Sequence, residues 1–422
     1  MHKIRNPHRT YEKTPKILDA VTELGADFLS DFTKVVSWSI DNCRVDENNR
    51  EKSGLPPEPY SLETLKWTEE DHAKPKLVEH ALAMVENEIN SWQWIYENIC
   101  DDDSKLILLT VLAYRAIGWR YVKMPLDNSA FWDCMRILSE AESNAEAHDT
   151  IQTEGLGILL SKMDLSAIGY DVNVYSDAFG TFNEFVYSQY VYRGRNNVIG
   201  PREGDVVMDC GACFGGTSMF FADQVGEKGK VFSFEFLPEN VEVFNRNRQQ
   251  NARLSSRVEL IKAPVWSTSN KTMSIEGNGP ATQVHLKSIP GAQEIHSVSI
   301  DDVVSEKKLT RLDFIKMDIE GAEMEALRGA KKSIKRFRPV LAICVYHKLM
   351  DFYELPQFVA SLNLGYRFYF QHSTVHGDET VVFAIPRERT DTLVQASGKN
   401  QLISGLLGKL LPKASSKTSS CN

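Results

Sequence analysis

The sequence predicts an α/β three-layer domain that follows a mainly helical N-terminal region. Strand-like apolar runs alternate with helical segments between about residues 166 and 390, and this alternation is typical of a sheet covered by helices. The near-continuous apolar run 339–345 suits a parallel strand that is buried on both faces. A polar turn at Gly377-Asp378 separates the last two strand-like runs, which predicts a closing antiparallel hairpin.

Each element follows from the local pattern of apolar residues. The acidic stretch 101–104 precedes the apolar run 106–119, and we interpret it as a helix cap rather than as a metal site. The segment 170–192 is rich in aromatic residues and valine, which predicts two or three short strands. The α/β series that follows is predicted to contain strands at 206–209, 230–235, 258–262, 312–318, 339–345, 366–371 and 380–385, and helices that begin at Thr217, span 238–250 and end near Leu327.

We expect three zones along the chain. Residues 1–165 would form a helical region that caps the cleft or mediates assembly, residues 166–390 the α/β domain, and residues 391–422 a flexible tail. Leucine pairs between 402 and 411 predict a short amphipathic helix in the tail, which would allow a weak peripheral contact with a membrane. The longest apolar run, 106–119, is shorter than the ~20 residues of a membrane span, so no transmembrane segment is expected.

The composition is that of a globular protein with an acidic balance. The chain has 422 residues, and 48 basic against 57 acidic side chains give a formal net charge of −9. This balance does not suit a protein that grips nucleic-acid backbones. Seven cysteines, an odd number, do not indicate a disulfide framework. A reducing, cytoplasmic setting is therefore expected.

The first candidate ligand-binding segment is the stretch 206–217, VVMDCGACFGGT. Asp209 ends a buried strand, Gly211 and Gly215 form a turn, and a helix follows. Gly211 allows the backbone to turn tightly and to approach a ligand, and ligands of open α/β sheets bind at the carboxyl ends of the strands. The spacing matches neither the dinucleotide fingerprint nor the phosphate-binding loop. On its own, the loop therefore fits a cofactor site and a plain turn equally well.

A second acid ends the next predicted strand. Glu235 follows Asp209 by 26 positions, near the roughly 20-residue spacing at which an acid binds the ribose hydroxyls of a dinucleotide. A carboxylate can accept hydrogen bonds from both hydroxyls of a diol. The alternative is that Glu235 only caps the following helix. Together with the glycine loop, ribose binding is the favoured interpretation.

The third candidate segment runs from Leu312 to Ala330. Lys316, Asp318 and Glu320 alternate at the end of an apolar strand, so an extended chain would place them on one face. Buried charges are costly unless they are paired or functional. Glu323 begins the next helix and could point back into the cleft. The alternative is an ion pair between Lys316 and Glu320 on a solvated rim.

Three motifs carry a resemblance to a known family: the glycine loop, VFSFE at 231–235, and KMDIEGAEMEALRGA at 316–330. Together they resemble the FkbM family of S-adenosylmethionine-dependent methyltransferases, over about residues 175–388. The resemblance implies a class I methyltransferase fold, a Rossmann-like three-layer sandwich with a mostly parallel seven-stranded sheet. It also implies methylation of a hydroxyl, often on a sugar or a secondary metabolite.

The same resemblance assigns roles to single residues. Asp209, Gly211 and Gly215 would shape the cofactor loop, Glu235 would hold the ribose, and Asp318 would lie near the transferred methyl group. Cys213, also in the loop, stands where the family usually has asparagine. The expected cofactor-binding residues are thus Asp209, Gly211, Cys213, Gly215, Glu235 and Asp318.

The chemistry of methyl transfer predicts the remaining site residues. A hydroxyl acceptor is a poor nucleophile unless a base takes its proton, and the candidates are Asp318, Glu320, Glu323 and His347. Two of these carboxylates could hold a divalent metal, but nothing in the sequence requires one, and no metal is expected. The expected partners are S-adenosylmethionine and a small-molecule or glycan hydroxyl acceptor, without nucleic acid; a homo-oligomer is compatible.

Two other functions remain open at the level of the sequence. One is a nicotinamide-dependent oxidoreductase, which the absent dinucleotide fingerprint disfavours. The other is a non-catalytic scaffold, although Asp209, Glu235 and Asp318 are all present. The Cys-x-x-Cys pair of Cys210 and Cys213 lacks a second pair that would complete a zinc site, so redox and zinc roles are disfavoured.

Overall fold

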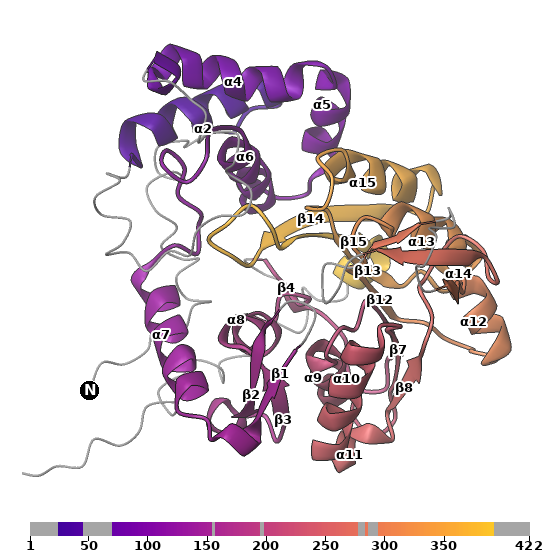
Figure 1. Cartoon of the computed structure of the whole chain (residues 1–422). Helices are drawn as coiled ribbons and strands as arrows, with labels where there is room; N and C mark the ends of the chain where they lie inside the picture. Colours follow the sequence, from indigo (N-terminus) through magenta and orange to yellow (C-terminus); the bar gives the residue numbers. More distant parts are fainter. Residues whose placement is uncertain are drawn as a thin grey trace, which may run out of the picture.

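A seven-stranded sheet forms the centre of the molecule (Figure 1). The computed structural model describes residues 24–44, 70–153, 157–194, 198–276, 283–285 and 294–391. Neighbouring strands follow the order β14-β15-β13-β12-β6-β7-β8. The strands are β6 (Val206–Cys210), β7 (Lys230–Phe234), β8 (Val258–Ile261), β12 (Phe314–Met317), β13 (Val340–Cys344), β14 (Tyr366–His372) and β15 (Thr380–Pro386).

The direction of the strands confirms the predicted fold class. β13, β12, β6, β7 and β8 run parallel to one another, whereas β15 runs antiparallel to both β13 and β14. The antiparallel strand of the predicted hairpin therefore lies inside the sheet, between β13 and β14. The chain builds outward from β6 in both directions, so the strand order reverses between β6 and β12. In open α/β sheets such a reversal marks the crevice where ligands bind.

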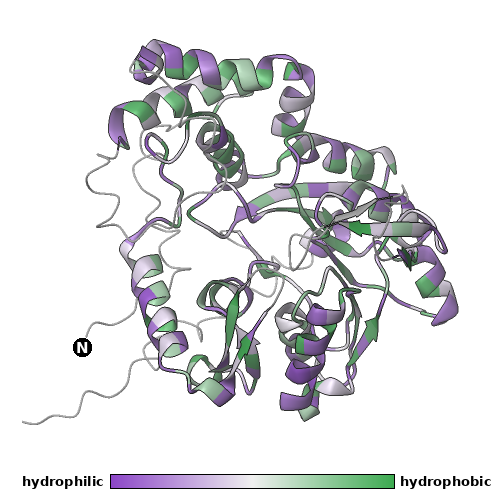
Figure 2. Cartoon of the chain, viewed as in Figure 1, coloured by the Kyte–Doolittle hydropathy of each residue, from purple (hydrophilic) through white to green (hydrophobic). Residues whose placement is uncertain are grey.

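Helices cover both faces of the sheet, and alternate residues of each strand supply the two cores. Met208 and Ile315 belong to the core that contains residues of α13 (Glu323–Gly329) and α14 (Lys331–Phe337), whereas Val207 and Phe314 belong to the core that contains residues of α9 (Gly216–Val225) and α10 (Pro238–Gln250). The strands of the sheet are accordingly hydrophobic, and the outer helices carry hydrophilic residues (Figure 2). The helices after β6 are α9 (Gly216–Val225), α10 (Pro238–Gln250), α11 (Ala252–Ser255), α12 (Ile300–Glu306), α13 (Glu323–Gly329), α14 (Lys331–Phe337), α15 (Asp351–Ser361) and α16 (Arg387–Asp391).

The N-terminal helices pack onto the edge of the sheet at β14. The apolar run predicted as a buried helix is α6 (Asp102–Ile117), and the Asp101 side chain accepts a hydrogen bond from the Ser104 N–H, as expected for a helix cap. Ser104 also bonds to the backbone of Phe370 in β14. Among the described residues, no helix combines the length and the apolar character needed to cross a membrane. The other helices of this region are α2 (Phe28–Asn42), η4 (Glu70–His72), α4 (Lys74–Glu86), α5 (Ile89–Asn98), α7 (Ser129–Ser143) and η5 (Ala147–Asp149).

The strands predicted between residues 170 and 192 are wrong for most of that segment. After β3 (Asn173–Ser176) the chain forms α8 (Ala178–Thr181) and the π-helix η7 (Phe182–Tyr187), before β4 (Tyr192–Arg193). The Asp177 side chain starts this turn of helix by accepting a hydrogen bond from the Gly180 N–H. The aromatic residues that resembled a strand pattern instead pack into the core from a helix.

Several short strands were not predicted. β1 (Thr150–Gln152) and β2 (Leu159–Asp164) pair with β3 in a small antiparallel sheet, so the end of the predicted helical zone contains strands. A second small sheet, after β8, contains β9 (Thr272–Glu276), β10 (Gln283–His285) and β11 (Glu294–His296). The short elements η6 (Ser166–Ile168) and β5 (Val198–Ile199) complete the fold. The predicted tail helix between 402 and 411 lies outside the described residues.

Candidate active site

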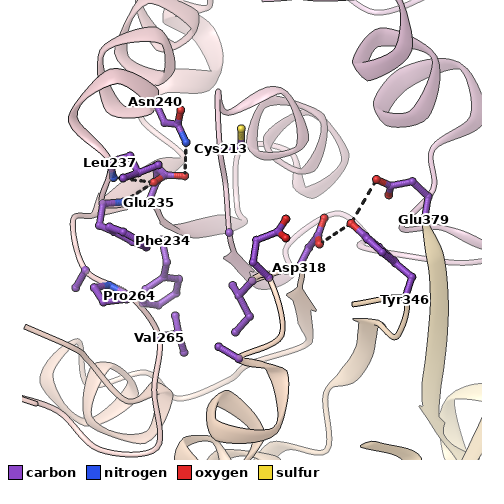
Figure 3. Close-up of a pocket in the computed structure, with 16 residues that line it drawn as sticks. Cys213, Phe234, Glu235, Leu237, Asn240, Pro264, Val265, Asp318, Tyr346 and Glu379 are labelled. Atoms are coloured by element: carbon purple, nitrogen blue, oxygen red, sulfur yellow. Dashed lines mark hydrogen bonds between the residues drawn. The ribbon is translucent and has the colours of Figure 1, made fainter. Parts of the chain in front are cut away.

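A cavity of about 170 Å³ opens at the carboxyl ends of β6, β7 and β12 (Figure 3). It lies at the reversal of strand order, where the fold predicts a ligand. No described residue before Gly211 lines it, so a role of the N-terminal region in covering the cleft stays a prediction. The lining residues are Gly211, Cys213, Phe234, Glu235, Phe236, Leu237, Asn240, Ala263, Pro264, Val265, Asp318, Ile319, Glu320, Ala322, Tyr346 and Glu379.

The glycine loop between β6 and α9 adopts left-handed backbone conformations. Gly211 has φ +84°, and a Cβ at this position would lie 1.8 Å from the carbonyl oxygen of Asp318. Gly215 has φ +86° and packs against the ring of Phe244. Cys213 has φ +46°, a conformation that asparagine tolerates better than most side chains. Burial raises the pKa of the Cys213 thiol well above its usual value, so this residue lines the cavity as an unreactive thiol.

Asp209 does not line the cavity but lies beneath the loop, fully buried. Its carboxylate lies 3.3 Å from the Lys316 ammonium, its neighbour in register on β12, and accepts a hydrogen bond from Ser218 at 2.6 Å. Lys316 also donates to the Gly211 carbonyl. The alternative of an ion pair between Lys316 and Glu320 is wrong, because Lys316 is buried and faces Asp209. Asp209 and Lys316 therefore join the glycine loop to β12.

Glu235, at the end of β7, lines the cavity and also caps α10. One carboxylate oxygen accepts hydrogen bonds from the N–H groups of Phe236 and Leu237, at 2.6 and 2.8 Å, and the other accepts from the Asn240 amide at 3.3 Å (Figure 3). The residue is 6% exposed, and burial raises the pKa of its carboxyl although the backbone donors oppose this shift. The capping role and a ligand-binding role are thus compatible at this position.

Asp318 directly follows β12 and faces the cavity between two tyrosines. It accepts hydrogen bonds from Tyr190 at 2.8 Å and from Tyr346 at 3.1 Å. Burial alone would raise its pKa, but the charges of Lys316 and His347 and the two hydroxyl donors outweigh this effect, and the pKa is lowered. Asp318 therefore presents an ionised carboxylate to the cavity.

Glu320, Glu323 and His347 form a cluster beside Asp318. His347 Nε2 lies 3.5 Å from both Asp318 Oδ1 and Glu320 Oε2, and Nδ1 lies 3.1 Å from Glu323 Oε1. Burial would lower the pKa of His347, but the surrounding carboxylates raise it to about 11. Glu320 lines the cavity, whereas Glu323 and His347 lie behind the lining. Of the described residues, Asp318, Glu320 and His347 form a group whose ligand atoms are close enough together to hold a metal ion.

The comparisons with known proteins agree with the geometry of the site. Residues 209–368 match the model of the family described as the methyltransferase FkbM domain. This segment is therefore similar to FkbM methyltransferase domains. The hexuronic acid methyltransferase AglP of Haloferax volcanii is 26% identical over 148 residues, which are 34% of this chain and 59% of the relative. The match thus spans less than two thirds of that relative.

Two solved structures were also compared with the chain. The methyltransferase FkbM of Methylobacillus flagellatus is 18% identical with a TM-score of 0.47, over 84% of this chain and 76% of that chain. The fibrillarin of Aeropyrum pernix, in complex with S-adenosyl-L-methionine, is 12% identical with a TM-score of 0.30, over 56% of this chain and 93% of that chain. At these TM-scores neither structure bears on the site described above.

Sequence reasoning missed several residues of the candidate site. Tyr346 directly follows β13, and the rule that ligands bind at strand ends could have identified it. The Tyr346 hydroxyl joins Asp318, at 3.1 Å, to Glu379, at 3.3 Å. Partial burial raises the pKa of the Glu379 carboxyl well above its usual value. Tyr190 follows the π-helix η7, far away in the sequence. No local pattern indicates Tyr190 or Glu379, because the hairpin and η7 reach the site through tertiary packing.

Glu184, from η7, was also missed. Its carboxylate lies at the N-terminus of α9, where it accepts hydrogen bonds from the N–H and hydroxyl groups of Thr217 at 3.0 and 3.1 Å. Burial raises the pKa of Glu184 to about 7. Cys210 and Cys213 are free thiols, and burial raises the pKa of Cys210 as well. The π-helix thus carries a titratable group to the glycine loop.

Proposed function

We propose that the chain is an S-adenosylmethionine-dependent O-methyltransferase acting on a hydroxyl of a sugar, glycan or secondary metabolite. The observation that carries the proposal is one cavity, lined mainly by the segment that matches the FkbM model, that brings together the glycine loop, Glu235 and Asp318. A nicotinamide-dependent oxidoreductase would need no carboxylate cluster after β12. A non-catalytic scaffold would not need to keep these carboxylates buried, at an energetic cost.

The side of the cavity at the end of β7 offers hydrogen-bond acceptors and apolar side chains that would suit the nucleoside of the cofactor. Glu235 and Asn240 lie side by side, and Asn240 Oδ1 is a buried acceptor with no hydrogen-bond partner among the described residues. A ribose diol offers two hydroxyl donors to such acceptors. Phe236, Leu237 and Val265 line the same cavity and provide apolar contacts for a purine ring. The loop around Gly211 and Cys213 would contact the part of the cofactor that lies beyond the nucleoside.

The wall at the end of β12 would hold the acceptor. S-adenosylmethionine supplies a methyl group that its sulfonium already activates, so the protein's task is to align the acceptor oxygen with it. Such positioning can contribute roughly 7–11 kcal/mol to lowering a barrier. The ionised carboxylate of Asp318, fixed by Tyr190 and Tyr346, would accept a hydrogen bond from the acceptor hydroxyl and then its proton. Glu320 is the second carboxylate of the lining within reach of this position.

The acceptor class follows from the curated relative and from the charge of the cavity. We infer a sugar acceptor, with a uronic acid as the first candidate, since the relative is described as a hexuronic acid methyltransferase. The acidic lining does not favour a nucleic-acid substrate. We place the reaction in the cytoplasm, in keeping with the cysteine usage of the chain.

Calorimetric titration of the full chain with S-adenosylmethionine and, separately, with NAD⁺ tests the proposal. We expect S-adenosylmethionine to bind and NAD⁺ not to bind. The Glu235→Ala variant should lose this affinity, whereas Asp318→Ala should keep most of it, because Asp318 would act on the acceptor. Binding of NAD⁺ alone would support the oxidoreductase, and binding of neither would refute the proposed cofactor.

A further inference from the structure

His347 is a buried side chain whose ring nitrogens lie close to three carboxylates but form no well-aligned hydrogen bond with them. It follows β13, its side chain is 8% exposed, and neither ring nitrogen has a hydrogen bond of acceptable geometry among the described residues. The nearest polar atoms are carboxylate oxygens of Asp318, Glu320 and Glu323, at 3.1–3.5 Å. Buried polar atoms in native proteins nearly always have a partner, so this histidine requires an explanation.

Three atoms of this cluster have the arrangement of an incomplete coordination sphere. Nε2 of His347 and one oxygen each of Asp318 and Glu320 lie within 4.8 Å of one another. Glu320 and Asp318 line the cavity, so the point between the three atoms borders the space that a ligand would occupy. One nitrogen and two carboxylate oxygens form a ligand set that suits a divalent cation such as Mn²⁺.

The other ring nitrogen of His347 faces a carboxylate that supports this arrangement. Glu323 Oε1 lies 3.1 Å from Nδ1 and accepts a hydrogen bond from the Ile319 N–H at 2.9 Å. Glu323 is 1% exposed, so it is fixed in position. A metal-binding histidine usually directs its second nitrogen to a carboxylate, which sets its orientation. Glu323 would act in this way as a positioning residue.

The charges around the cluster also favour a cation. Asp318, Glu320 and Glu323 surround His347, whereas Lys316 lies against Asp209 and Lys348 donates to the Gly321 carbonyl. Carboxylates out of water are stable only when they are paired or bind a metal. A protonated His347 would supply one positive charge, and a divalent cation would supply two.

We propose that Asp318, Glu320 and His347 bind a divalent cation, whose remaining coordination positions face the cavity and hold two oxygens of the acceptor. The binding of the cation stands on its own, whereas its role toward the acceptor rests on the proposed function. The acceptor would then present adjacent oxygens, as in a sugar diol or in a uronic acid that carries a hydroxyl beside its carboxylate.

Mn²⁺ alone is the probe, and the loss of the free-ion signal in electron paramagnetic resonance measures its binding to the full chain. Glu320→Gln and His347→Asn remove one ligand each and should weaken the affinity at least about tenfold, while Glu323→Gln should weaken it roughly 10- to 100-fold. Glu325→Gln is the matched control, because Glu325 lies on the same helix as Glu323, α13, and pairs with Arg328 instead of His347. This control should leave Mn²⁺ binding unchanged. Circular dichroism checks that each variant is folded.

The wild-type chain provides a second measurement that does not depend on any variant. Pulsed resonance of its bound Mn²⁺ should detect coupling to an imidazole nitrogen. Absence of saturable Mn²⁺ binding, absence of nitrogen coupling, or equal affinities of the wild type and the Glu320→Gln and His347→Asn variants would overturn the proposal. His347 would then be an imidazolium that only pairs with the carboxylates. The S-adenosylmethionine titration separates the two ideas, since the cofactor can bind where Mn²⁺ does not, and Mn²⁺ can bind where the cofactor does not.

Discussion

The substitution Glu235→Gln separates the two roles of this residue. In the native chain one oxygen accepts from two backbone N–H groups at the start of α10, and the other faces Asn240 and the cavity. A glutamine keeps an oxygen for the backbone donors. Its amide nitrogen, however, can only donate, and a ribose hydroxyl would meet a donor instead of an acceptor. The helix cap is retained and the ligand contact is lost.

The expected loss follows from the energy of a hydrogen bond to a charged group. Such a bond contributes roughly 1.5–3 kcal/mol, and a tenfold change in affinity corresponds to roughly 1.4 kcal/mol. The dissociation constant of S-adenosylmethionine should therefore rise roughly 10- to 150-fold. The free energy of unfolding should change by about 1 kcal/mol or less, because both backbone capping bonds remain and only the long contact from Asn240 is lost. Glu235→Ala, in contrast, should lose stability as well, since the N–H groups of Phe236 and Leu237 lose their acceptor.

Isothermal titration calorimetry gives the affinity, and urea unfolding gives the stability. Glu239→Gln is the matched control, because this neighbouring glutamate of α10 does not line the cavity. Its affinity should equal that of the wild type. If Glu235→Gln binds S-adenosylmethionine as tightly as the wild type, Glu235 is a helix cap alone and the assignment of the ribose site is refuted.

Three further predictions concern the loop and its neighbours. Gly211→Ala should lower the free energy of unfolding, measured by urea titration, by at least about 2 kcal/mol. The left-handed backbone costs a non-glycine residue roughly 1–2 kcal/mol, and the added Cβ would overlap the Asp318 carbonyl. A smaller loss would mean that the loop relaxes freely. Cys213→Asn should be at least as stable as the wild type, whereas Cys213→Val should be less stable. Asparagine tolerates positive φ, and β-branched residues do not. Equal midpoints of thermal unfolding for the two variants would contradict the φ of +46° at this position. Burial raises the pKa of Glu184 to about 7 from an ordinary value of 4.5. Between these two pH values the folded state keeps a proton that the unfolded state releases. The contribution of Glu184 to wild-type stability should therefore fall as the pH rises from 4.5 to 7. Glu184→Gln keeps an acceptor for Thr217 and has no titrating proton. Its free energy of unfolding relative to the wild type should therefore rise between pH 4.5 and 7. A difference between the two proteins that stays constant with pH would show that Glu184 titrates normally.

The architecture was predictable because its signals are local. Apolar runs such as 339–345 are long enough to be distinguished from loops, and Pro238 and the glycine loop mark where helices begin. Strand ends then place Glu235 and Asp318 at one edge of the sheet without any knowledge of tertiary contacts. The segment 170–192 was predicted incorrectly because its aromatic spacing fits both a strand and a buried helix, and periodicity alone cannot separate the two.

The partners within the site were less predictable than its principal carboxylates. Asp209 was expected at the cofactor loop, but it is buried beneath that loop with Lys316. Glu379 and Tyr190 reach Asp318 from a hairpin and from the segment after a π-helix, and only long-range packing brings them there. His347 was expected as a candidate base, and the structure places it behind the cavity lining, with its ring nitrogens facing three carboxylates.

Asp318 and Glu320 lie close together in the turn after β12, as expected, but not for the expected structural reason. Alternation along an extended strand predicted that Asp318 and Glu320 share a face, yet β12 ends at Met317. The chain then turns through left-handed conformations at Glu320, φ +56°, and Gly321, φ +90°, and this turn brings both carboxylates to His347. A glutamate in this conformation is strained by roughly 1–3 kcal/mol, and such strain is typically retained where function requires it. A glycine at position 320 would remove the strain together with the carboxylate that the proposed cation site uses.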